Sequence, residues 1–157
     1  MRVLPLVAVC LFLGAGFSSA QTESRVGAPA RLTQVFLSIE NLPPTAKACG
    51  ITENLIKDAF VTSASFSRLQ ITDDMRAPTF YIHVGTFQSS TGLCVSPTNY
   101  RLYIRQQAQP PFNELDLWID GSIVQSKKSE HAQMVKEDVE TYAKKFLTQW
   151  NLDKKPQ

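Results

Sequence analysis

Apolar and polar residues alternate along five segments of the chain, and this period of two predicts β-strands. The first segment is 31–44, in which Val35, Leu37 and Ile39 point to one side and a pair of prolines ends the strand. The other four predicted strands are 67–72, 79–88, 99–106 and 114–124. Turn-forming residues separate them, including the "SPTN" sequence at 96–99.

Two further segments place apolar residues at helical spacing. Thr52 is a suitable N-cap for a helix within 49–66, and Glu53 suits the positive end of the helix dipole. Ser129 is predicted to cap a second helix that runs to about Asn151. The predicted buried faces are Leu55, Ile56, Ala59 and Phe60 in the first helix, and Val135, Val139, Tyr142, Phe146 and Trp150 in the second.

The resulting order, β-α-β-β-β-β-α, predicts an α+β fold. We expect a two-layer sandwich, in which a mainly antiparallel sheet of about five strands carries two helices on one face. By size, residues 31–152 form a single domain. Residues 21–30 are predicted to be a mobile leader and residues 153–157 a disordered tail.

The first twenty residues have the pattern of a secretory signal peptide. Arg2 gives the positive start, an apolar run follows to about Phe17, and Ser18 and Ala20 place small residues at the cleavage positions. Cleavage is predicted after Ala20, which makes the mature protein secreted or periplasmic. The alternative, an uncleaved anchor, has an apolar run that is short for a membrane span. The rest of the sequence predicts no membrane-spanning segment, so we do not expect an integral membrane protein.

Cys49 and Cys94 are the cysteines that remain after cleavage. Paired cysteines of exported proteins usually form disulfides, because the compartment is oxidising. A metal site would need more ligands than His83 and His131 supply, and a redox motif would need cysteines closer in sequence. A catalytic thiol would need a base nearby, for which His83 is the candidate. We therefore predict a Cys49–Cys94 disulfide, without a metal or cofactor.

The side of the predicted sheet away from the helices is the candidate binding surface. Such a face is usually polar, but alternate strand positions here place aromatic and charged residues together. Tyrosine, tryptophan and arginine dominate binding hot spots, and exposed patches of this kind mark interaction sites. The predicted binding residues are Phe36, Tyr81, His83, Arg101, Tyr103, Arg105 and Trp118; Phe87, Asp116 and Asp120 are expected on the same face.

Two interpretations of this face remain open alongside binding. Aromatic residues also pair across strands for stability, and a loop can cover them. In the binding hypothesis, a partner buries Trp118 while Arg101 or Arg105 aligns an acidic group. Nucleic acid is an unexpected partner, because the mature chain carries 15 basic and 14 acidic residues once Arg2 is removed.

The order of elements resembles small envelope domains without a catalytic site, such as those of lipoproteins that assist outer-membrane assembly or transport. The "CGI" sequence at 49–51 and the later single cysteine also resemble small secreted bacterial proteins. This resemblance implies a non-enzymatic binding or assembly module that holds an envelope protein, peptide or lipid by its sheet face or a sheet edge. One alternative is a hydrolase inhibitor acting through loops 88–99 or 106–114. Another is a small hydrolase built around His83.

Overall fold

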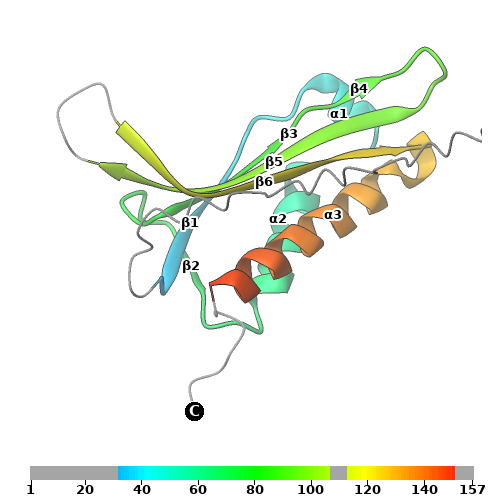
Figure 1. Cartoon of the computed structure of the whole chain (residues 1–157). Helices are drawn as coiled ribbons and strands as arrows, with labels where there is room; N and C mark the ends of the chain where they lie inside the picture. Colours follow the sequence, from blue (N-terminus) through cyan, green and yellow to red (C-terminus); the bar gives the residue numbers. More distant parts are fainter. Residues whose placement is uncertain (1–31, 107–112, 151–157) are drawn as a thin grey trace, which may run out of the picture.

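The computed structural model describes residues 32–106 and 113–150. The predicted signal peptide, leader and tail lie outside these residues. Figure 1 shows a sheet with α2 and α3 packed side by side on one face. In chain order the elements are β1 (Gln34–Ile39), α1 (Pro44–Ala48), α2 (Glu53–Ala64), β2 (Gln70–Thr72), β3 (Thr79–Val84), β4 (Phe87–Gln88), β5 (Cys94–Gln106), β6 (Asn113–Ser126) and α3 (Lys128–Gln149).

The sheet confirms the predicted two-layer α+β class. Its strands lie in the order β2-β1-β3-β5, with β4 beside the start of β5 and β6 along the opposite side of β5. β1 runs parallel to β2 and β3, whereas β5 is antiparallel to β3, β4 and β6. The prediction had no separate α1 and treated β3 and β4 as one strand. The short helix α1 begins directly at the prolines that end the first predicted strand, because proline fits the first helical turn.

The two long helices follow the predicted apolar spacing. The Thr52 hydroxyl accepts a hydrogen bond from the Leu55 N–H at 3.2 Å and caps α2 as predicted. α3 begins at Lys128 instead of after Ser129, and its N-cap Lys127 makes no side-chain capping bond. The core lies between these helices and the sheet. At its centre, the Phe80 ring lies 4.5 Å from the Phe60 ring and 4.8 Å from the Phe146 ring, between centroids.

β5 contradicts the predicted turn at 96–99. The strand begins at Cys94 and runs through Pro97, although proline lacks the N–H that a central strand uses. The neighbouring strand is interrupted beside Pro97, between Val84 and Phe87. There the Gly85 N–H donates to the Pro97 carbonyl at 3.1 Å. The backbone nitrogen of Pro97, which carries no hydrogen, therefore faces the gap between β3 and β4. No regular hydrogen bond between strands is lost there.

A β-bulge in β6 changes which side chains face the helices. Leu102 pairs with Trp118 and Tyr103 with Asp116, so Leu117 is an extra residue. An extra residue reverses the alternation of everything after it. The prediction that Trp118 and Asp120 lie on the face away from the helices is therefore wrong, and Ile119 lies on that face instead.

The positions beyond the bulge agree with this reversal. Trp118 packs against the core, 5.8 Å from Phe80 and 5.6 Å from Phe146 between ring centroids. Ser122, four residues later, donates to the Asp138 carboxylate of α3 at 2.7 Å. Ile119 is 55% exposed. The reversed alternation thus holds through the middle of β6.

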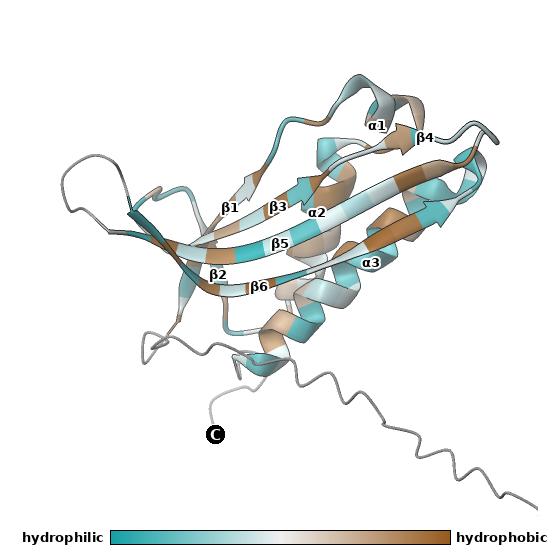
Figure 2. Ribbon diagram, turned by 45° about the horizontal axis from the view of Figure 1, so that its top comes forward, coloured by the Kyte–Doolittle hydropathy of each residue, from teal (hydrophilic) through white to brown (hydrophobic). Residues whose placement is uncertain are grey.

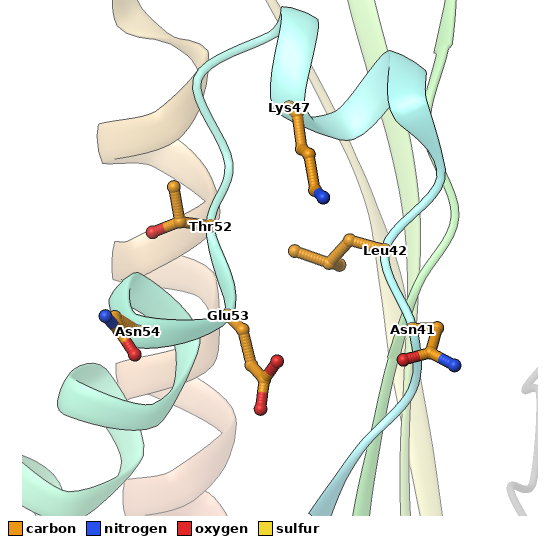
Figure 3. A pocket seen from close by; sticks show the side chains of 6 residues that line it. All are labelled: Asn41, Leu42, Lys47, Thr52, Glu53 and Asn54. Atoms are coloured by element: carbon orange, nitrogen blue, oxygen red, sulfur yellow. The ribbon is translucent and has the colours of Figure 1, made fainter.

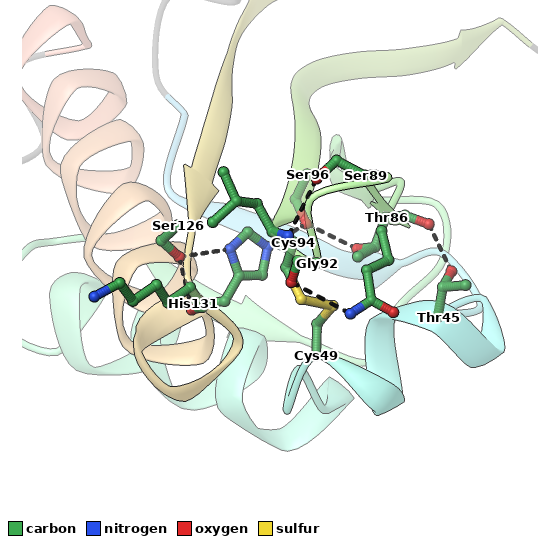
Figure 4. Close-up of a disulfide and its surroundings, with 12 residues drawn as sticks. Thr45, Cys49, Thr86, Ser89, Gly92, Cys94, Ser96, Ser126 and His131 are labelled. Atoms are coloured by element: carbon green, nitrogen blue, oxygen red, sulfur yellow. Dashed lines mark hydrogen bonds between the residues drawn. A yellow bond between two sulfur atoms is a disulfide. The ribbon is translucent and has the colours of Figure 1, made fainter.

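A disulfide joins Cys49 to Cys94, as predicted. It ties the end of α1 to the start of β5, and both cysteines are buried (Figure 4). A chain of buried polar side chains lies beside it. Thr86 Oγ1 is 2.8 Å from Ser96 Oγ, which lies 2.8 Å from His131 Nε2. The interior at this end of the molecule is therefore held by one covalent bond and by polar groups that satisfy one another.

His131 is expected to make the stability of the protein pH-dependent. This residue is fully buried, and burial lowers its pKa from the usual 6.5. As the pH falls below about 6.5, the unfolded chain takes up a proton that the folded chain resists, so stability is lost on acidification. Urea unfolding between about pH 7.5 and pH 5.5, above the range in which carboxylates titrate, measures this loss.

The substitution His131→Gln is expected to flatten that pH dependence, whereas His83→Gln, which removes the other histidine, leaves it in place. An unchanged slope in His131→Gln would contradict this assignment. Both variants are compared with wild type in the slope of stability against pH, so a uniform loss of stability in either one does not obscure the result.

Candidate binding face of the sheet

The candidate site is the side of the sheet opposite α2 and α3, called here the helix-free face. Figure 2 looks onto it, with both helices behind the strands. Strand register places Tyr81 beside Arg101, and His83 beside Asn99, alternating with core residues such as Phe80 and Ile82. The structure brings together on this face six of the seven predicted binding residues, namely Phe36, Tyr81, His83, Arg101, Tyr103 and Arg105. Trp118 is the exception.

One cluster on this face is centred on the Glu40 carboxylate, just after β1. Its Oε2 accepts a hydrogen bond from the Tyr81 hydroxyl and lies 2.5 Å from His83 Nδ1. These two contacts lower the pKa of Glu40, with the Tyr81 bond as the larger cause. Burial and the bond to Glu40 raise the pKa of Tyr81 to about 12. The tyrosine is therefore a neutral donor at physiological pH, and the imidazole is oriented by a carboxylate.

The two predicted arginines are already paired with acidic residues of β6. Arg101 Nε lies 2.9 Å from Asp116 Oδ1, and its NH2 lies 3.4 Å from Glu114 Oε2. The Arg105 Nε is 3.9 Å from Glu114 Oε1. An acidic ligand would have to compete with both carboxylates, so these arginines are poorly placed to align one. This half of the face is close to charge-neutral.

Tyr103 is covered on the helix-free face, contrary to the expectation of an exposed ring. It is 4% exposed, with the guanidinium carbons of Arg101 and Arg105 at 5.2 and 5.7 Å from its ring centroid. Arg105 also donates to its hydroxyl at 3.2 Å. The two arginines therefore stack on the Tyr103 ring and cover it.

The exposed apolar surface of the same face extends from the middle of β6, where Ile119 lies opposite Arg101, toward the end of the sheet that carries β4. Phe87 is 53% exposed, Ile119 55% and Ile123 73%. Pro97 is also exposed and pairs with Ile123 across β5 and β6. Figure 2 shows the apolar segments at the ends of β5 and β6 nearest β4. We call these four residues the apolar strip.

Sequence reasoning missed three members of the apolar strip and had a signal for two. Leu117, Trp118 and Ile119 are three consecutive apolar residues, and they interrupt the alternation of the first half of the strand, as a bulge would. Taking the bulge into account would have moved Ile119 and Ile123 to the helix-free face. Pro97 was assigned to a turn.

His83 lies between the polar cluster and the apolar strip. A side-chain carbon built on Gly85 would lie 3.4 Å from His83 Nε2 and 3.4 Å from Pro97 Cγ. With Nδ1 held by Glu40, the Nε2 atom is directed toward the strip. Within the described part of the chain, Glu40 is the hydrogen-bond partner of the His83 side chain. The geometry therefore gives His83 an orienting carboxylate on Nδ1.

His131 contacts two hydroxyls, those of Ser96 and Ser126, and its contact with Ser96 is inaccessible to a substrate. Ser96 Oγ and His131 Nε2 lie 2.8 Å apart, as a nucleophile and its base can, but both residues are fully buried. Among residues 32–106 and 113–150, no three histidine, cysteine, aspartate or glutamate side chains are grouped to hold a metal ion. The same residues include no helix with the length and apolar character to cross a membrane.

An open pocket of about 520 Å³ lies near the start of α2 (Figure 3). Lys47 and Leu42 point into it, with Glu53 across from them. Opposite charges on its walls give it no preference for a charged ligand. The lining residues are Asn41, Leu42, Lys47, Thr52, Glu53 and Asn54.

One of the two loops of the inhibitor hypothesis, 88–99, differs from its prediction. Of segment 88–99, only 89–93 joins two strands, and it folds into a tight turn. In that turn the Ser89 N–H donates to the Leu93 carbonyl at 2.8 Å, and Gly92 has a φ of 80°. Most of segment 106–114 lies outside the described residues. The first loop is thus shorter than predicted, because residues 94–99 belong to β5.

Comparisons with known proteins find similar structures but no match to the sequence. No family model matches the sequence, and no curated protein matches it either. A minor lipoprotein of Acinetobacter baumannii is similar in structure with a TM-score of 0.39 and 10% identity, over 82% of this chain and 100% of that one. The rare lipoprotein B of Shewanella oneidensis has a TM-score of 0.37 and 12% identity, over 75% of this chain and 93% of that one. Both TM-scores are too low to define the fold or the function of this chain.

Proposed function

We propose that this chain is an exported, non-enzymatic binding module of the cell envelope, and that its helix-free face holds the partner. The exposure of the apolar strip on a face that the helices leave uncovered is the observation that carries the proposal. Contiguous exposed apolar side chains usually mark a surface that another molecule covers. The signal-peptide pattern and the disulfide support an extracytoplasmic site of action.

The two ends of the face contribute differently to binding. Burying one large apolar side chain is worth about 1.5–3 kcal/mol, so the strip supplies the favourable free energy. Association itself costs at least about 4 kcal/mol, so a partner also needs contacts outside the strip. His83 Nε2, directed toward the strip, offers a hydrogen bond there. The partner that fits is an envelope protein or peptide that presents an apolar side chain with a polar group beside it; a lipid surface is the alternative.

The substitution Ile123→Lys is expected to weaken partner capture at least about tenfold, because it places a charge in the most exposed position of the strip. Cross-linking to a native envelope fraction, followed by pull-down and quantification of the captured partner, measures the effect. Met75→Lys is the matched control, since Met75 is also exposed, at 59%, but lies in the connection between β2 and β3. Equal capture by wild type and both folded variants would remove the basis of the proposal.

A further inference from the structure

The outer side of β6 is an open edge of the sheet. Within the described part of the chain, this 14-residue strand pairs with β5 and with no strand on its other side. An open edge presents unpaired N–H and C=O groups that another strand can use.

Two hydrogen bonds show which residues of β6 direct their backbone groups outward. The Pro97 carbonyl accepts from Gly85 on the β3 side, so Pro97 and its partner Ile123 form a non-hydrogen-bonded pair in the β5–β6 ladder. The Gly121 carbonyl accepts from the Tyr142 hydroxyl of α3 at 2.8 Å instead of from β5. Ile119 lies two residues before Gly121, so its backbone groups point to the same side of the strand. Ile119, Gly121 and Ile123 therefore face the open edge, and the two isoleucines belong to the apolar strip.

The centre of this edge is occupied by side chains of the same chain. The Gly121 carbonyl is held by Tyr142, and the Gly121 N–H donates to Asp120 Oδ1 at 2.9 Å. Lys145 pairs with the other oxygen of Asp120, and its Nζ lies 5.7 Å from the centre of the Tyr142 ring. Asp120, Tyr142 and Lys145 thus form an edge guard that satisfies both outward groups of Gly121.

We infer that the β6 edge is a pairing surface for β6 of a second copy of this chain, and that the edge guard keeps it closed. The strand is self-complementary when a second copy runs antiparallel in a register centred on Gly121. Ile119 of each copy then lies opposite Ile123 of the other. The charges agree with this direction, because Glu114 and Asp116 lie near the start of β6, and Lys127 and Lys128 follow its end, so an antiparallel copy brings opposite charges near one another. A parallel copy would bring like charges together.

The guard acts at the position that matters most for this register. In a two-fold antiparallel pair, the central residue exchanges both of its backbone hydrogen bonds with its own copy. Tyr142 and Asp120 occupy those two groups. Inward-pointing charges and helix residues laid on an edge are common means of preventing such pairing. Wild type is therefore expected to be monomeric, and the variant without the guard to associate.

The test uses the double variant Asp120→Ala with Tyr142→Phe, which retains the ring stacked on Tyr100. Light scattering after size exclusion is expected to give a monomer for wild type and a dimer for this variant at the same concentration. The dissociation constant of the dimer should be at least tenfold lower for the variant than for wild type. Tyr81→Phe is the matched control, because it removes a tyrosine–carboxylate bond away from β6 and should remain monomeric. If the double variant does not fold, Tyr142→Phe alone should show a smaller shift in the same direction.

Cysteine cross-linking checks the register. Each cysteine is introduced into the double variant that lacks the edge guard. A mixture of the Ile119→Cys and Ile123→Cys proteins should then form more disulfide-linked dimer than either protein alone. Adding Ile123→Lys should restore the monomer. A folded unguarded protein that stays monomeric at high concentration, or a wild type that dimerises equally well, would overturn the inference. Phe87→Ser separates it from the proposed function, since that change should weaken partner capture without affecting self-association.

Discussion

Replacing Cys49 and Cys94 together by alanine is expected to lower the free energy of unfolding by about 4 kcal/mol. The disulfide closes a loop with a sequence separation of 45 residues, and a cross-link of that length removes much of the freedom of the unfolded chain. Urea denaturation followed by far-UV circular dichroism measures the loss. For a domain of this size, such a change is a large fraction of the whole stability.

The position of the disulfide adds a structural reason for the size of this effect. It ties α1 to the start of β5 next to the buried chain of Thr86, Ser96 and His131. Without the disulfide, this end could open more easily. Opening would break the hydrogen bonds among these side chains and loosen the contact between α3 and the sheet. Wild type in reductant should approach the stability of the double variant, and the difference between the two reports the effect of the alanines alone.

Because both sulfurs are buried, the oxidised native protein should react with thiol reagents neither before nor after brief exposure to mild reductant. Strong reductant with denaturant should release two thiols. Two reactive thiols in the native exported protein, or a stability change below about 1 kcal/mol in the double variant, would be incompatible with this role of the disulfide.

The sequence predicts the parts of this fold that depend on local spacing. The apolar spacing of 135, 139 and 146 is a property of one helix, and these residues are buried in α3 as expected. The Thr52 cap needs only its own first turn. The disulfide follows from the compartment and from an even count of cysteines, and it needs no knowledge of the fold.

The features that escaped prediction depend on contacts between distant segments. Pro97 is acceptable in β5 because a different strand is interrupted beside it. His131 is buried because Ser96 and Ser126 supply partners for its two nitrogens, at 2.8 and 2.9 Å. The pairing of Arg101 with Asp116 depends on how β5 and β6 align. No property of a single segment reports these arrangements.

The bulge in β6 had the largest consequence for the candidate site. A shift by one residue exchanges the two faces of a strand, so a single extra residue replaced Trp118 by Ile119 on the helix-free face. The predicted set of residues on the helix-free face was thus correct in β3 and β5, where the alternation is unbroken, and wrong in the half of β6 that follows Leu117.

Trp118→Ala is expected to cost about 3 kcal/mol of unfolding free energy, because it leaves a cavity between the sheet and α3. The indole packs against Phe80 and Phe146, and its Nε1 donates to Gln149 Oε1 at 2.5 Å. The loss is placed at the lower end of the range for large aromatic residues, since Trp118 is only partly buried. Urea unfolding gives the stability of the variant.

Ile119→Ala is the matched control, because it alters the next residue of the same strand. The bulge places this side chain on the opposite face, and its truncation should change the stability by less than about 1 kcal/mol. The two variants should also differ in function. Ile119→Ala should weaken partner capture in a folded protein, whereas Trp118→Ala should affect capture only as far as it unfolds the chain. The reverse order of stabilities would mean that β6 has no bulge, and Trp118 would then return to the binding face in place of Ile119 and Ile123.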